Sequence, residues 1–125
     1  MARILIAEDE EALRGFLRRA LGEAGHDVVV AADGAEALEL LTPAAGAFDL
    51  LLTDIKMPVM DGIALALASA RDDRELVILL MTGYADQRDR AHGLDTLIHG
   101  VIAKPFTVAE IQFEVAAALA ARGKR

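Results

Sequence analysis

The sequence contains no cysteine, which excludes disulfide bonds and thiol chemistry. It also has no apolar run close to the roughly 18 residues that a membrane-spanning helix needs. The first ten residues, MARILIAEDE, hold only a short apolar stretch before acids interrupt it, so they do not resemble a secretory signal. These absences predict a cytoplasmic protein with no membrane segment.

Positive charge is also scarce. The chain has 13 Lys and Arg residues against 20 Asp and Glu residues, a net charge of −7, and its basic residues cluster only in the tail ARGKR. Proteins that bind nucleic acids usually carry a basic patch, so we expect no nucleic-acid partner. The acidic balance favours a cation or a basic protein surface. The three histidines show no metal-ligand spacing, and we interpret them as surface or loop residues: His26, His92 and His99.

Short apolar runs alternate with segments of helical periodicity along the 125 residues. The alternation predicts an α/β fold in which helices cover both faces of a parallel sheet. We expect one domain over residues 1–121, followed by a basic tail at 122–125. The predicted strands cover residues 2–7, 26–31, 48–53, 75–81 and 98–103, and the predicted helices cover 10–24, 32–41, 61–71, 85–94 and 107–121.

Several polar residues mark helix boundaries. Asp33 and Asp61 stand where a helix N-cap is expected, and Thr107 with Glu110 has the spacing of a capping box. We interpret these residues as caps and not as ligands.

A second set of polar residues follows the predicted strands. Ligands of open parallel sheets bind beyond the carboxyl ends of the strands, so residues at those ends are the candidates for a site. The acids are Glu8 and Asp9 after the first strand and Asp54 after the third. Thr82 and Lys104 follow the fourth and fifth strands.

These five side chains together favour phosphoryl chemistry. Three adjacent carboxylates repel one another, and Mg²⁺ relieves such repulsion. A carboxylate can also attack phosphorus and form an aspartyl-phosphate, while a lysine and a hydroxyl can bind phosphate oxygens. Glu8 or Asp9 alone fits a cap or a solvated loop equally well. Thr82 alone would most often be a strand-end hydroxyl and Lys104 alone a solvated loop lysine, so only the full set argues for a site.

Four motifs carry a family resemblance: AEDE at 7–10, LLLTDIKMPVMDG at 50–62, MTGYA at 81–85 and AKPF at 103–106. In this order they resemble the receiver domains of two-component response regulators, over nearly the whole chain. The resemblance implies a flavodoxin-like, doubly wound sheet of five parallel strands in the order 2-1-3-4-5. It also implies a cis peptide bond before Pro105.

The resemblance also implies a role for each site residue. Asp54 matches the phosphoryl acceptor. Glu8 and Asp9 match the acidic pair at Mg²⁺, with Asp9 as the direct ligand and Glu8 acting through water. Lys56 matches the position whose backbone carbonyl binds the metal. The remaining matches are the switch hydroxyl and the phosphate-binding lysine, Thr82 and Lys104.

A receiver domain takes its phosphoryl group from a histidine kinase or a phosphotransfer protein. It catalyses only this transfer and a slow hydrolysis. Because no output domain is expected after the last helix, we predict a monomer or weak dimer that signals by binding a downstream effector protein.

Within the family, ARILIAEDE and LLLTDIKMPVMDG resemble the CpdR type, whose members are phosphorylation-gated adaptors for regulated proteolysis. A phosphorelay shuttle and a phosphorylation-independent binding module are the alternatives. A haloacid-dehalogenase-type phosphatase fits less well, because it needs a second acid where this chain has Lys56.

Two features depart from the common receiver pattern. Val101 stands where many receivers have a switching aromatic residue, so we expect the signal to depend on Thr82 and the loop around Tyr84. Tyr84 beside Lys56 predicts slow loss of phosphate, which a Tyr84→Ala variant would accelerate.

The closing helix predicts a second partner surface. Helical spacing places Val108, Ile111, Val115 and Leu119 on one face, which we expect in the core. Phe113 lies on the opposite face among alanines, as a candidate docking residue.

Overall fold

Strands and helices alternate along the part of the chain that the computed structural model describes, which is residues 2–41, 47–83, 94 and 96–122. The predicted helix over residues 85–94 lies, except for its last residue, outside this part. The other predicted elements are present with ends shifted by one or two residues. They are β1 (Arg3–Ala7), α1 (Glu11–Glu23), β2 (Asp27–Ala31), α2 (Gly34–Leu41), β3 (Leu50–Asp54), α3 (Gly62–Asp72), β4 (Val77–Thr82), β5 (Gly100–Ala103) and α5 (Val108–Arg122).

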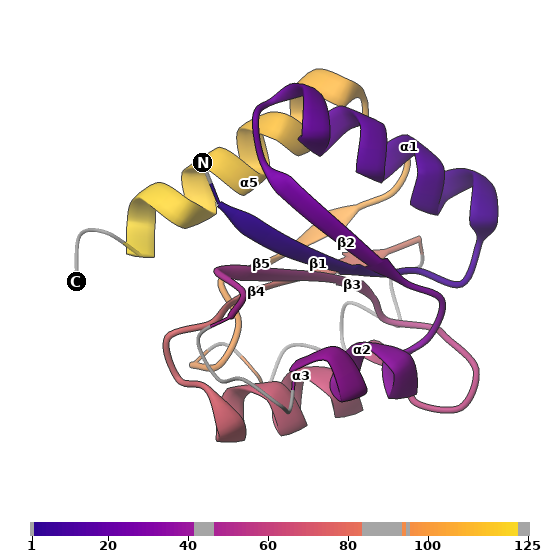
Figure 1. The fold of residues 1–125 in the computed structure, drawn as a ribbon, viewed down its shortest axis with the longest axis vertical. Helices are drawn as coiled ribbons and strands as arrows, with labels where there is room; N and C mark the ends of the chain where they lie inside the picture. The colour runs from indigo at the N-terminus through magenta and orange to yellow at the C-terminus, as the bar shows by residue number, and fades with distance from the viewer. Residues whose placement is uncertain (1, 42–46, 84–93, 95, 123–125) are drawn as a thin grey trace.

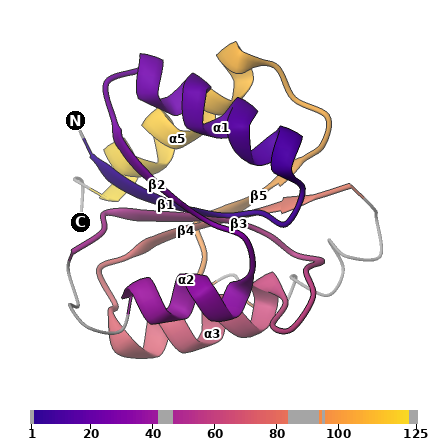
Figure 2. The same cartoon turned by 45° about the vertical axis from the view of Figure 1, so that its right-hand side comes forward.

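All five strands are parallel and lie in the order β2-β1-β3-β4-β5. Helices α1 and α5 cover one face of the sheet, and α2 and α3 cover the other (Figures 1 and 2). The predicted doubly wound five-stranded fold is therefore confirmed for the described residues. No helix among these residues is both long and apolar enough to cross a membrane.

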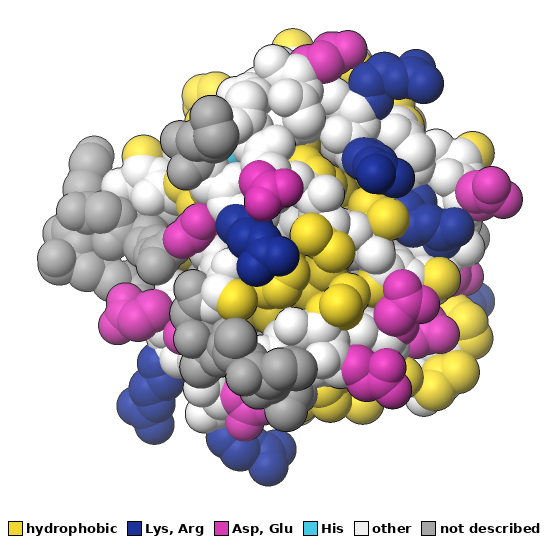
Figure 3. All heavy atoms as spheres, in the orientation of Figure 1, with side chains coloured by type: hydrophobic (Ala, Val, Ile, Leu, Met, Phe, Trp, Pro, Cys, Tyr) yellow, Lys and Arg dark blue, Asp and Glu magenta, His cyan; other side chains and the backbone are white. Residues whose placement is uncertain are grey.

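The strands divide their side chains between two hydrophobic cores. Ile4 and Ile6 of β1 pack on the side of α1 and α5, whereas Leu5 packs on the side of α2 and α3. Every residue of β3 and β4 is buried, as their unbroken apolar runs predict. Strand β2 lies at the edge of the sheet and its three valines are half-buried. Hydrophobic side chains accordingly reach the surface over this edge (Figure 3).

The predicted caps are confirmed. The Asp33 carboxylate accepts a hydrogen bond from the Glu36 amide at 2.8 Å, and the Asp61 carboxylate accepts one from the Ala64 amide at 2.9 Å. Thr107 and Glu110 form a reciprocal capping box, with distances of 3.1 and 2.8 Å. Each cap satisfies an amide that would otherwise lack a partner at the start of a helix.

Helix α5 buries most, but not all, of the predicted face. Ile111 and Val115 are fully buried, and Leu119 packs partly against the core. The prediction for Val108 was wrong, because this side chain is 38% exposed. Val108 is the first residue of α5 and lies about one turn before Ile111, where the predicted face first reaches the core. Phe113 is 69% exposed, as expected from the opposite face.

Candidate functional site

The register of the sheet brings the carboxyl ends of the strands to one edge. Ala7 at the end of β1 lies beside Thr53, one residue before Asp54. Asp54 in turn pairs with Met81, and Thr82 pairs with Ala103. The residues at or just after these strand ends are therefore neighbours in space: Glu8, Asp9, Asp54, Thr82 and Lys104.

Three carboxylates of this set converge. Glu8, Asp9 and Asp54 each offer one oxygen, and these oxygens lie within 4.8 Å of one another. Glu8 and Asp54 are buried, whereas Asp9 is exposed. Hard carboxylate oxygens with one side open to solvent suit Mg²⁺, which prefers a few carboxylates together with water and phosphate oxygens. The donor set therefore fits a magnesium ion.

Lys104 reaches two of these carboxylates from the end of β5. Its Nζ lies 3.2 Å from Asp54 Oδ1 and 3.3 Å from Glu8 Oε1. Burial acts to lower the pKa of Lys104, but the negative charges of Asp54 and Glu8 outweigh it and raise this pKa above its ordinary value. Lys104 is therefore a cation placed directly at the carboxylates of Asp54 and Glu8.

Glu8 has both side-chain oxygens occupied within the protein. Oε1 is paired with Lys104, and Oε2 accepts a hydrogen bond from the Glu10 amide at 3.0 Å. A direct bond from Glu8 to a metal would share an oxygen with one of these partners. Asp9 is exposed, and its carboxylate is the more available of the two.

Burial also changes the acidity of the two inner carboxylates. It raises the pKa of Asp54, although the charge and hydrogen bond of Lys104 oppose the change. Burial likewise raises the pKa of Glu8, against a hydrogen bond from the Glu10 amide. Ionised Asp54 and Glu8 therefore lower the stability of the folded protein when no cation is bound beside them.

The backbone of Asp54 is held from two sides. The Thr53 hydroxyl donates a hydrogen bond to the Asp54 carbonyl at 3.0 Å. A Cβ atom at Gly62 would come within 2.0 Å of this same carbonyl oxygen. In the sequence, Gly62 is visible only as the last residue of the motif at 50–62 and as part of the predicted helix over 61–71. Its role in the close approach of α3 to Asp54 has no local sequence signal.

Arg14 also escaped the sequence analysis. Its Nη1 donates a hydrogen bond to the Glu8 carbonyl at 2.8 Å and lies 3.5 Å from the Asp9 carbonyl. An arginine one turn inside a predicted helix is ordinarily read as part of a solvated face. The available signal was the run of four acids at residues 8–11, which calls for a nearby cation.

The remaining predicted residues lie around this cluster or away from it. Thr82 is buried at the end of β4, and the Lys56 side chain is exposed. The Lys104–Pro105 bond is cis, as expected.

The predicted partner-surface residues lie on two sides of the sheet. Val101 packs on the side of α2 and α3, whereas Phe113 projects from α5 on the other side. A surface that includes both residues must pass around the β5 edge. Tyr84 lies outside the described residues.

The two histidines in the described part of the chain, His26 and His99, make no contact with the carboxylate cluster. His26 is half-buried in the turn before β2, where its Nδ1 accepts a hydrogen bond from the Ala2 amide at 3.2 Å. His99 is exposed just before β5. His92 lies outside the described residues. The prediction of surface or loop positions is confirmed for His99, and His26 is a partly buried turn residue.

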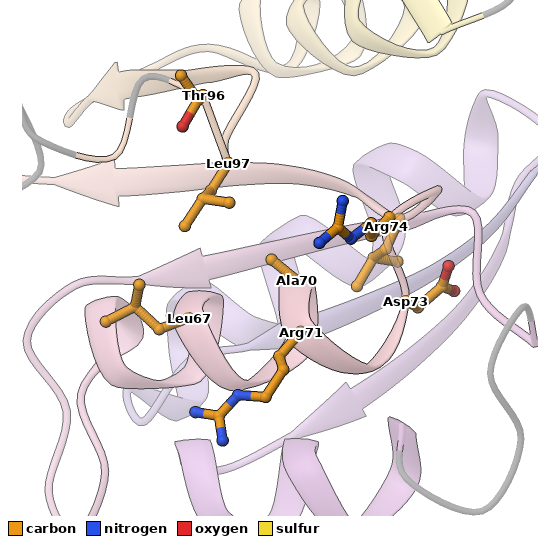
Figure 4. A pocket seen from close by; sticks show the side chains of 8 residues that line it. Leu67, Ala70, Arg71, Asp73, Arg74, Thr96 and Leu97 are labelled. Atoms are coloured by element: carbon orange, nitrogen blue, oxygen red, sulfur yellow. The ribbon is translucent and has the colours of Figure 1, made fainter.

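Hollows among the described residues include two of different character. One of about 550 Å³ lies between the end of α3 and the segment before β5, with Leu67, Arg74 and Leu97 in its lining (Figure 4). It is at the amino end of β4, away from Asp54. The other, of about 350 Å³, lies between α1 and the segment that joins β5 to α5, and Lys104 forms part of its lining. Of these two hollows, the second adjoins the carboxylate cluster, because Lys104 contacts Asp54 and Glu8.

Comparisons with known proteins agree with this geometry. The family model of the response regulator receiver domain matches residues 4–116. The response regulator receiver protein CpdR of Brucella abortus is 40% identical over 115 residues, which cover 92% of this chain and 94% of CpdR. The transcriptional regulatory protein PrrA of Mycobacterium tuberculosis is 33% identical over 97% of this chain, and the chain spans 51% of the length of PrrA.

A solved structure with the same fold contains a metal. The response regulator TrrA of Thermotoga maritima, in complex with Mg²⁺ and BeF, superimposes with a TM-score of 0.84. It is 29% identical, and the match covers 94% of this chain and 99% of TrrA.

Proposed function

This chain belongs to the response regulator receiver domain family, and from that premise we propose that it is a signalling protein that accepts a phosphoryl group on Asp54. The donor is the phosphohistidine of a histidine kinase or a phosphotransfer protein. The phosphorylated and unphosphorylated forms differ in their affinity for a downstream effector protein. Apart from its own phosphorylation and slow dephosphorylation, the protein has no enzymatic role.

The transfer follows from the groups around Asp54. A carboxylate oxygen of Asp54 attacks phosphorus, a P–O bond forms, and the P–N bond to the donor imidazole breaks with its electron pair moving to nitrogen. Lys104 Nζ moves its interaction from the carboxylate to a phosphoryl oxygen, and the Thr82 hydroxyl supplies a further donor. Asp9, Asp54 and the Lys56 carbonyl would hold a magnesium ion, with Glu8 acting through water, and the ion would offset the negative charge that collects during transfer.

One observation supports this proposal above the others. Lys104 Nζ lies within 3.3 Å of oxygens from both Asp54 and Glu8, and the third carboxylate, Asp9, stands open to solvent. A structural ion pair needs one lysine and one acid. A third converging acid, left exposed, adds only repulsion unless a cation binds.

The adjacent groove is suited to the donor protein. A phosphohistidine must come within bonding distance of Asp54, so its carrier has to contact the surface next to Lys104. The hollow between α1 and the β5–α5 segment provides an apolar wall there, which includes Leu13, Phe16 and Phe106. The rings of Phe16 and Phe106 lie 6.3 Å apart. We assign this groove to the protein that carries the phosphohistidine.

The chemistry can be tested without knowing the donor. The protein is incubated with Mg²⁺ and a small acyl phosphate, and its intact mass is measured beside an Asp54→Asn variant. We expect a gain of one phosphoryl group in the wild type, none in the variant and none after chelation of Mg²⁺. A wild type that gains no phosphoryl group from several acyl phosphates would favour a phosphorylation-independent binding module.

For the output we propose an adaptor role like that of the CpdR type. The supporting observation is the identity of 40% to CpdR over nearly the full length of both chains. Phe113 offers a docking residue on α5, because it is exposed and its truncation would not disturb the core. A Phe113→Asp variant that remains folded should lose effector binding but keep acyl-phosphate labelling. A phosphorylated protein that passes its phosphoryl group on to a histidine protein would instead indicate a relay shuttle.

A further inference from the structure

The turn between β1 and α1 must hold two carboxylates against strong repulsion. Residues 8–11 are all acidic, and two of them, Glu8 and Asp9, converge on Asp54. The N-cap residue of α1, Glu10, makes no side-chain capping hydrogen bond. Within the described residues, the turn is held by the Glu8 amide, which donates to the Ala31 carbonyl, and by the side-chain contacts of Glu8 and Arg14.

Arg14 is the cation that contacts this turn through its backbone. Its half-buried side chain extends from the first turns of α1, and one guanidinium nitrogen donates to the Glu8 carbonyl and lies near the Asp9 carbonyl. A guanidinium is a planar fork that can engage neighbouring oxygens at once. Arg14 thereby contacts the backbone carbonyls of Glu8 and Asp9, whose side-chain carboxylates converge with that of Asp54.

We propose that Arg14 is a positioning residue for the Mg²⁺ site, which holds the β1–α1 turn so that Asp9 and Glu8 converge on Asp54. This inference rests on the proposed function, because it assumes that the cluster binds a metal. Removal of a residue that contacts and orients a metal ligand typically lowers metal affinity 10-fold to 100-fold. Arg14 acts on the ligands through their peptide groups and does not touch the metal or the phosphoryl group.

The sign of the effect separates positioning from simple charge. Loss of a nearby positive charge lowers the repulsion of a cation, so Mg²⁺ would bind more tightly if Arg14 acted by charge alone. If Arg14 positions the turn, an Arg14→Gln variant binds Mg²⁺ more weakly, by about 10-fold. Arg14→Lys should recover part of the affinity, because a lysine can still donate to one carbonyl.

Arg18 provides the matched control. It lies one turn further along α1 and is exposed, and its side chain makes no hydrogen bond or ion pair to any residue that the structure describes. Arg18→Gln removes the same charge from the same helix without changing the turn. We expect its Mg²⁺ affinity to equal or slightly exceed that of the wild type.

The experiment is a calorimetric titration of Mg²⁺ into wild type, Arg14→Gln, Arg14→Lys and Arg18→Gln at fixed ionic strength. Metal-free thermal unfolding of each variant shows that it is folded. Positioning is supported if Mg²⁺ affinity falls from the wild type to Arg14→Lys and falls further to Arg14→Gln. If Arg14→Gln does not fold, the comparison of Arg14→Lys with the wild type decides the question. Equal or tighter binding in the Arg14 variants overturns it. A wild type that binds no Mg²⁺ overturns the metal requirement of the proposed function as well.

Discussion

The two edges of the sheet hold ion pairs of similar length in different surroundings. At the carboxyl edge, Lys104 Nζ lies 3.2 Å from Asp54 Oδ1, and these side chains are 23% and 10% exposed. At the amino edge, Arg3 Nε lies 3.5 Å from Asp27 Oδ2, and these side chains are 46% and 68% exposed. The buried pair has perturbed pKa values and a third and fourth charged group beside it, whereas water screens the exposed pair. Distance alone therefore does not separate a site from a surface contact, but burial does.

The largest effect is expected from overpacking at the carboxyl edge. Gly62→Ala places a Cβ against the Asp54 carbonyl oxygen, where only backbone atoms could move away. We expect the free energy of unfolding to fall by about 3 kcal/mol in urea denaturation, because overpacking at a rigid backbone is costly. Gly15→Ala in α1 is the control, since its Cβ meets no atom within 4 Å. The control should be stabilised by about 0.5–1 kcal/mol. Equal effects for the two variants would contradict the close approach.

The second effect has the opposite sign. Asp54→Asn removes a buried charge that is held beside two other acids, so the metal-free variant should be more stable than the wild type by about 1 kcal/mol at neutral pH. Addition of Mg²⁺ should stabilise only the wild type, because ligand binding favours the folded state. Chemical denaturation of both proteins with chelator and with Mg²⁺ measures these differences. A variant that is less stable than the metal-free wild type would show that the Lys104–Asp54 pair stabilises the fold.

The pH dependence of this difference follows from the raised pKa of Asp54. The folded protein holds the Asp54 proton more tightly than the unfolded chain, so the contribution is favourable below the unfolded pKa and is lost as pH rises through the folded pKa. The stability advantage of metal-free Asp54→Asn should therefore be small at acid pH and grow until Asp54 is ionised in the folded protein. Unfolding curves of both proteins across the acid range measure this trend. An advantage that shrinks with rising pH would contradict the effect of burial.

The smallest effect is expected at the amino edge. The exposed Arg3 side chain forms an ion pair with Asp27 and donates a hydrogen bond to the Ala47 carbonyl. Its guanidinium carbon lies 4.5 Å from the centre of the Phe48 ring. Arg3→Gln should lower the free energy of unfolding by at most about 1 kcal/mol, and less at high salt. Mg²⁺ affinity and acyl-phosphate labelling should not change. A clear loss of either would mean that the two edges are coupled through β1.

The architecture was predictable because the strong local signals agree. The unbroken apolar runs of β3 and β4 indicate strands buried on both faces, and Asp33, Asp61 and Thr107 cap the helices that they precede. Exact ends were less predictable. Phe48 belongs to the loop before β3, where its ring lies beneath Arg3. Val108 has the right spacing for the core but stands too early in α5 to reach it.

By itself, the sequence determined the order of the elements, the placement of Asp54 at the end of a buried strand, and the collection of Glu8, Asp9, Thr82 and Lys104 at neighbouring strand ends. These follow from periodicity and from the rule that parallel strands end at one edge. Tertiary structure alone decided that Glu8 is buried with both carboxylate oxygens paired, whereas Asp9 is exposed to solvent. It also decided that Gly62 must lack a side chain and that Arg14 contacts the turn. Those features depend on distances between segments that are far apart in the chain or on the direction of a side chain, and no local pattern of residues encodes them.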